Sequence, residues 1–207
     1  MSRQKLERDE QDELILEATI SHLSTGDPIP LSWAVEHATE FSHAWARSGH
    51  ASLLLKIAAF AVPRPALVLA ASAIAKKALP SAYDDRPEKA IDIAEAWARG
   101  EASADDVREA CNDTADAVTD RGGISREVAR AAGDAAFLAL AVDSYDAADS
   151  AVSSAEAAVE AVWLSSTTAR TRADRVAIWD GMANIVRAQL AHRDILADVV
   201  NANRSAL

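Results

Sequence analysis

The hydrophobic and polar residues of this chain follow a helical period along nearly its whole length. Apolar positions recur three and four residues apart, and no stretch shows the strict alternation of a half-buried strand. Breaks rich in glycine and proline separate expected helices at about residues 4–22, 32–46, 51–62, 65–79, 85–99, 103–119, 125–142, 145–164 and 172–200. The pattern therefore predicts an all-α bundle of about eight to nine mostly antiparallel helices.

The expected helices form one domain over all 207 residues, because no linker or internal repeat divides them. We divide this domain into an N-terminal helical extension (1–50), a central core (51–165) and a C-terminal helix (166–207). The chain contains 48 alanines, whereas only 5% of its residues are aromatic. Alanine is the best helix former and has a small side chain, so we expect helices that approach one another closely.

The segment YDDRPEKAIDIAEAWARGE, residues 83–101, contains the clearest helix start and stop signals. Asp85 and Glu88 have the spacing of a capping box, and Pro87 falls in the first turn, where its missing N–H costs little. Trp97 lies on the apolar face, and Gly100 can adopt the left-handed conformation that ends a helix. The segment thus predicts a helix of about four turns with a defined beginning and end.

Two more polar residues are expected to begin helices. Ser103 is followed three residues later by Asp106, again with the spacing of a capping box. Ser125 follows the RGG break and is expected to cap the next helix.

The net charge of −11 is unevenly distributed along the chain. Residues 84–120 contain twelve acidic and four basic side chains, and residues 134–169 contain six acidic side chains and no basic one. This distribution disfavours nucleic-acid binding, which requires clustered lysine and arginine, and favours a basic protein partner. The acidic residues that we expect to contact such a partner are Asp84, Asp85, Glu109, Asp113, Asp116, Asp146 and Glu156.

The most apolar segment, residues 51–75, is interrupted by Lys56, Arg64 and two prolines, so it predicts a buried helical hairpin and no membrane contact. The first residues lack the apolar run of a signal peptide, and we expect a cytoplasmic protein. The single cysteine, Cys111, excludes a disulfide within the chain and falls on an expected apolar helix face.

Two groups of residues suggest chemistry. Asp84, Asp85 and Glu88 resemble the aspartate-rich motif with which helical prenyl-transferring enzymes hold Mg²⁺ and a diphosphate, and this is the alternative to helix capping. Glu40 and His43 form one E-x-x-H unit of the kind used twice in di-iron bundles, but no second copy is present. We favour capping and a solvated helix face for these residues, and we expect no catalytic residue, metal or cofactor.

The central segment also resembles a known family. Leu79-Pro80, the acidic run Asp84–Pro87, the stop Trp97–Glu101 and Ala131-Ala132-Gly133 are similar to motifs of bacterial all-helical immunity proteins. These proteins form the fifth-numbered immunity class of polymorphic toxin systems, and the resemblance covers roughly residues 72–163.

The resemblance implies a cytoplasmic protein that binds and neutralises a cognate toxin without catalysis. Family members often carry histidines in the helix after Ala-Ala-Gly, where this chain has Leu138 and Leu140. Two other functions stay open: the metal- or diphosphate-dependent enzyme, and a self-assembling scaffold in which alanine-rich faces pair between copies of the chain.

Overall fold

The computed structural model describes residues 14–21, 37–120, 122–166, 171–191, 195 and 198. These residues form helices, short 3-10 turns and loops, with no strand among them, which confirms the all-α prediction. Besides a helical segment at 14–21, the elements are α3 (Ala38–Arg47), α4 (Ala51–Ala61), α5 (Arg64–Ala75), η1 (Leu79–Ser81), α6 (Arg86–Ala98), α7 (Ala104–Asp120), α8 (Gly123–Phe137), η2 (Leu138–Leu140), α9 (Ser144–Ser165) and α10 (Arg172–Gln189).

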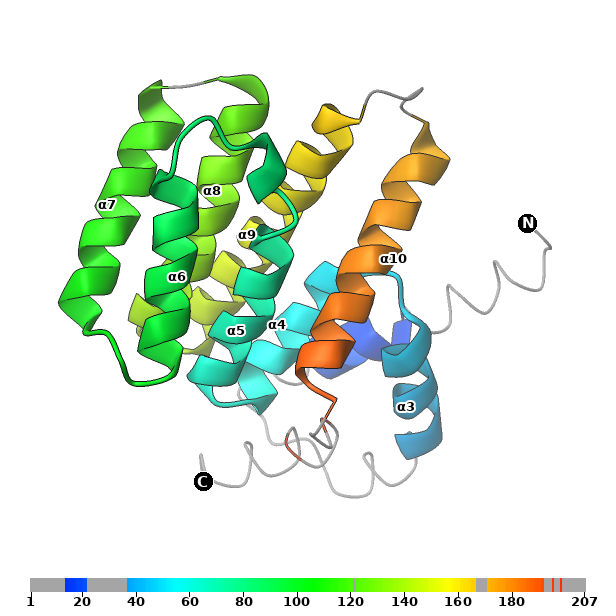
Figure 1. Ribbon diagram of the computed structural model, residues 1–207. Coiled ribbons are helices and arrows are strands. Elements are labelled where there is room, and N and C mark those ends of the chain that lie inside the picture. Colours follow the sequence, from blue (N-terminus) through cyan, green and yellow to red (C-terminus); the bar gives the residue numbers. More distant parts are fainter. Residues whose placement is uncertain are drawn as a thin grey trace.

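Helices α5 to α10 alternate in direction, so that successive helices are antiparallel neighbours (Figure 1). Helix α8 packs against α6, α7 and α9, which makes it the central helix of this half of the bundle. Helix α9 in turn packs against α4 and α5, and α10 packs over α4 and α5. The short turn η2 packs against α5, α7 and α8 at the end of the bundle where α8 gives way to α9.

Alanine side chains supply much of the core, as the composition predicts. The fully buried or nearly fully buried alanines of α8 and α9 include Ala131, Ala132, Ala135, Ala136, Ala147, Ala148, Ala151, Ala155, Ala157, Ala158 and Ala161. At this interface the Ser154 hydroxyl, itself buried, donates a hydrogen bond of 2.8 Å to the carbonyl oxygen of Ala131. Small side chains therefore bring the two helices close enough for a side-chain hydroxyl of one to reach the backbone of the other.

The apolar segment 51–75 forms two consecutive helices, α4 and α5, which are separated at Val62 and Pro63. Both helices supply buried leucine, isoleucine and alanine side chains to the core. Within the described part of the chain, no helix combines the length and apolarity required to cross a bilayer.

Several helix ends differ from the sequence prediction. Helix α5 ends at Ala75, four residues before the expected 79, because the chain turns through η1 and Pro80. Helix α8 begins at Gly123 after Gly122 as its N-cap, so the prediction that Ser125 caps this helix is wrong. Ser103 and Asp106 form the predicted reciprocal pair, in which the Asp106 carboxylate accepts from the Ser103 backbone N–H at 2.8 Å and Ser103 Oγ accepts from the Asp106 N–H at 3.2 Å.

The C-terminal helix holds α3 in place. Arg187 of α10 donates hydrogen bonds from one guanidinium nitrogen to the carbonyl oxygens of Trp45 and Ser48, at 3.0 and 2.8 Å. These carbonyl groups lie at the end of α3, where the helix itself offers them no donor. The predicted beginnings of the first two helices, at about residue 4 and at Ser32, lie outside the described residues.

Candidate protein-binding surface

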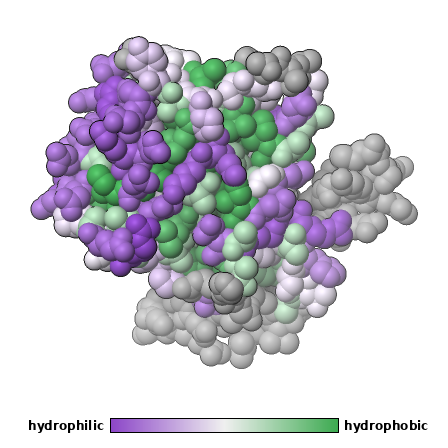
Figure 2. Space-filling model, in the orientation of Figure 1, coloured by the Kyte–Doolittle hydropathy of each residue, from purple (hydrophilic) through white to green (hydrophobic). Residues whose placement is uncertain are grey.

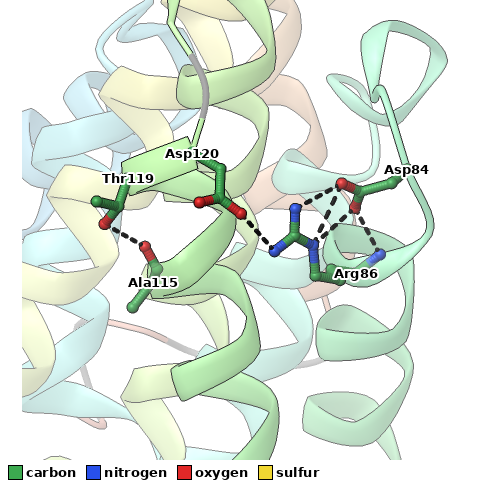
Figure 3. A network of polar contacts seen from close by, with 5 residues as sticks. All are labelled: Asp84, Arg86, Ala115, Thr119 and Asp120. Atoms are coloured by element: carbon green, nitrogen blue, oxygen red, sulfur yellow. Dashed lines mark hydrogen bonds and ion pairs between the residues drawn. The ribbon is translucent and has the colours of Figure 1, made fainter.

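The loop before α6 is organised by Arg86 (Figure 3). One carboxylate oxygen of Asp84 accepts from the backbone N–H of Arg86 at 3.1 Å, and the other accepts from the Arg86 guanidinium at 2.8 Å. The same guanidinium reaches Asp120, at the end of α7, with a nitrogen-to-oxygen distance of 3.4 Å. Arg86 therefore ties the beginning of α6 to the end of α7, and the two carboxylates raise its pKa.

Asp85 occupies the N-cap position of α6, but its side chain does not cap the helix, so the predicted capping box with Glu88 is wrong. The backbone of Asp85 is already helical (φ −89°, ψ −5°), whereas a capping residue normally has extended backbone that lets its side chain reach the first amides. Its carboxylate instead pairs with Lys89, one turn later, at 2.7 Å. That pairing lowers the pKa of Asp85 and raises the pKa of Lys89.

These contacts bear on the enzyme alternative. Asp84 and Asp85 each face a cation of the protein itself, so they are not arranged as a cluster that awaits a metal ion. Across the described residues, no group of three or more histidine, cysteine, aspartate and glutamate side chains is arranged to hold a metal. On α3, Glu40 and His43 of the E-x-x-H unit are both exposed.

Helix α7 carries the largest concentration of negative charge, with six carboxylates and one arginine. The carboxylates at its two ends have partners: Asp105 pairs with Arg108, Asp106 with Ser103, and Asp120 with Arg86.

The middle of α7 differs. Glu109, Asp113 and Asp116 form no ion pair or hydrogen bond with any other residue that the structure describes. Lys89 interacts electrostatically with Asp113, but its ion pair is with Asp85, which contributes more to its raised pKa.

The three residues Glu109, Asp113 and Asp116, here called the α7 acidic face, are exposed and follow one another at steps of four and three. Hydrophilic residues gather over the α6 and α7 side of the molecule, on the left of Figure 2. Carboxylates at these spacings lie one turn apart on the same side of a helix and repel one another. The α7 acidic face is therefore a dense negative surface that other described residues do not neutralise.

A second set of carboxylates lies on α9. Asp146 and Glu156 are exposed and unpaired among the described residues, as is Asp149 between them. Glu160, near the end of α9, is different because it pairs with Arg175 of α10 at 3.0 Å. Since α8 packs between α7 and α9, the predicted partner residues form two separate groups, apart from Asp84 and Asp85 in the loop before α6.

Sequence reasoning did not single out Asp134, a half-buried acidic group whose pKa is shifted. Its carboxylate, in α8, accepts a hydrogen bond of 2.5 Å from Ser153 of α9. Burial raises the pKa of Asp134, although Ser153 and Arg130 act in the opposite direction. The only sequence signal is an aspartate within an alanine-rich helix, which does not reveal its neighbour on another helix.

Cys111 lies near this group. Its thiol is half-buried, and burial, with a smaller contribution from Asp134, raises its pKa to about 11. A thiol with so high a pKa is mostly protonated at neutral pH and is a poor nucleophile. The prediction that Cys111 lies on the packed face of its helix agrees with its position against the α8 backbone at Gly133.

No family model, curated protein or solved structure matches this chain. The resemblance to immunity proteins therefore stays a prediction.

Proposed function

We propose that this chain is a non-catalytic binding protein, and that it neutralises a cognate bacterial toxin by docking a basic surface of that toxin. The observation that carries the proposal is the α7 acidic face, whose three exposed carboxylates form no ion pair or hydrogen bond with other described residues. Carboxylates at the beginning of the neighbouring helix α6 do form ion pairs: Asp84 with Arg86, and Asp85 with Lys89.

Unpaired like charges on one helix face reduce stability, because each i,i+3 or i,i+4 pair of carboxylates costs a few tenths of a kcal/mol. A basic partner would remove this repulsion on binding, so the charge that costs stability in the free protein would favour the complex. The surface charge would also steer the partner during encounter, which raises the association rate at low ionic strength.

The carboxylates of α9 support the same proposal. Asp146, Asp149 and Glu156 form a second negative group on the other side of α8, with no base in the whole of α9. A partner large enough to span both helices would contact two acidic groups at once, whereas a small basic ligand would contact only one.

The direct test uses the protein encoded by the adjacent gene. Binding is measured between the two purified proteins, and protection of the cells is measured when the two are co-expressed. We expect a complex whose association rate falls steeply as salt is raised, with protection of cells from that protein. The triple variant Glu109→Gln, Asp113→Asn and Asp116→Asn should associate at least about tenfold more slowly at low salt.

A matched control neutralises carboxylates elsewhere. Glu17→Gln with Glu40→Gln changes two exposed acids on the 14–21 segment and α3, away from α7. This control should bind like the unmodified protein. A partner that binds the triple variant and the control equally, or no binding and no protection at all, would contradict the proposal.

A further inference from the structure

Three exposed apolar side chains, Phe137, Val142 and Tyr145, here called the apolar patch, lie close together in sequence where α8 passes into α9. Phe137, Val142 and Tyr145 expose 47%, 87% and 45% of their surface. They are three of the six large apolar side chains that are exposed among the described residues, and they fall within residues 137–145. Scattered single apolar residues on a surface are ordinary, but a concentration in one short segment is typical of an interaction site.

The segment that carries this patch is held firmly. Arg64, at the start of α5, donates hydrogen bonds to the carbonyl oxygens of Ala141 and Asp143. The Asp143 carboxylate caps α9 by accepting from two backbone amides, at 2.8 and 3.0 Å. The ring of Tyr145 packs edge-on against Phe60 of α4 at 5.1 Å between centroids.

Between the exposed residues, Leu138 and Ala141 are buried and anchor the turn to the core. The exposed side chains are thus presented on a fixed backbone, which lowers the entropic cost of binding a partner.

The charge around the patch is negative. Asp143, Asp146 and Asp149 are exposed along the first turns of α9. Arg64, a base that contacts this segment, is engaged by the backbone carbonyl groups of Ala141 and Asp143. A symmetric contact with a second copy of the chain would bring these carboxylates against their own equivalents, which disfavours self-association through this surface.

We infer that Phe137, Val142 and Tyr145, with Asp146 and Asp149 at the rim, dock an amphipathic segment of a partner protein in which apolar side chains alternate with lysine or arginine. This inference rests on the proposed function, because it assigns an anchoring point to the basic partner whose wider contact is the α7 acidic face. The apolar side chains would supply affinity, and the carboxylates would select a basic segment over an acidic one.

The test uses the full chain and two fluorescent synthetic peptides. One is an amphipathic peptide of leucine and lysine, and the other has serine in place of each leucine with the same charge. The leucine-containing peptide should bind at least about tenfold more tightly than the serine-containing one. The double variant Phe137→Ser and Val142→Ser should remove that difference, whereas its effect on the serine-containing peptide should be small.

The matched control is Val176→Ser, because Val176 of α10 is 51% exposed and lies on another helix. This control should leave both affinities unchanged. Equal affinity of the two peptides, an equal loss in the control, or self-association that Phe137→Ser and Val142→Ser abolish would each overturn the inference.

The outcomes also separate this inference from the proposed function. In one outcome, the triple variant of the α7 acidic face loses binding to the adjacent-gene protein, whereas the double variant Phe137→Ser and Val142→Ser binds it normally. This outcome would support the proposed function and contradict the role of the apolar patch. Patch-dependent binding of the leucine-containing peptide, without binding of the adjacent-gene protein, would do the reverse.

Discussion

The interface between α8 and α9 and the outer face of α7 use the same helical backbone in opposite ways. The first is filled with buried alanines and contains a hydrogen bond from Ser154 to the backbone of α8. The second exposes three carboxylates that no described base neutralises. The first surface stabilises the fold by close packing, whereas the second concentrates negative charges that repel one another.

Sequence composition alone does not reveal the role of a helix in this protein. Both α7 and α9 are rich in alanine and acid, yet α9 buries all seven of its alanines, whereas α7 buries only Ala110 and Ala117 of its four. What separates them is position: α9 packs against α4, α5, α8 and α10, whereas α7 packs chiefly against α6 and α8. The face of α7 that no described helix covers is the face available to a partner.

The largest expected effect comes from enlarging an alanine in the packed interior. Ala151→Leu adds three carbons at a fully buried position and should lower the free energy of unfolding by about 1–3 kcal/mol. The same change at the exposed Ala115 of α7 should leave it within about 0.5 kcal/mol of the unmodified value. Urea denaturation measures both, and equal losses would contradict the distinction between the two surfaces.

A smaller effect is expected at the contact between α7 and α8. A Cβ atom at Gly133 would lie 2.8 Å from Oγ1 of Thr114, whose hydroxyl is held by hydrogen bonds to the Ala110 and Cys111 carbonyl oxygens. Gly133→Ala should therefore destabilise the protein by about 1 kcal/mol, although alanine is the better helix former.

A second substitution, Thr114→Ala, removes the hydroxyl group that a Cβ atom at Gly133 would meet. In a Thr114→Ala background, Gly133→Ala should become stabilising by about 0.5–1 kcal/mol, because only the helix propensity then remains. Thermal or urea unfolding of the four proteins checks the sign change, and a stabilising Gly133→Ala in the original background would refute the steric argument.

The smallest expected effect sharpens the other side of the comparison. Neutralising the α7 acidic face with Glu109→Gln, Asp113→Asn and Asp116→Asn should raise the free energy of unfolding by about 0.2–0.5 kcal/mol for each repulsive pair removed. The gain should shrink as salt is added, since salt screens exposed charges. A loss of stability at low salt would mean that these carboxylates have stabilising partners, and would weaken the argument that they are kept for binding.

Much of the fold could be predicted from the sequence because the helical period, the alanine content and the breaks act locally. The beginning of α9 near Tyr145, the reciprocal pair of Ser103 with Asp106, and the left-handed Gly100 (φ 79°) all follow from nearby residues. The exposure of Glu109, Asp113 and Asp116 was likewise predictable from their spacing on one helix face.

The remaining features depend on residues that are distant in sequence or on a competing local contact. Asp85 was expected to cap α6. Instead, the Asp84 carboxylate accepts the hydrogen bond from the Arg86 N–H, and the Asp85 carboxylate forms an ion pair with Lys89. The burial of Asp134 depends on Ser153 from another helix, and the apolar patch depends on how η2 turns the chain. Neither follows from periodicity, because periodicity identifies a face and not the element that covers it.

The hydrogen bonds from Arg187 to the end of α3 also have a consequence for the order of folding. Arg187 is separated in sequence from Trp45 by 142 positions and from Ser48 by 139 positions. These hydrogen bonds therefore form only after a very long loop of the chain has been closed. From α5 to α9, each helix packs against the next one along the chain, so these helices can assemble first. Helix α3 is therefore expected to reach its final place late, once α10 has docked and offers its guanidinium to the open carbonyl groups of α3.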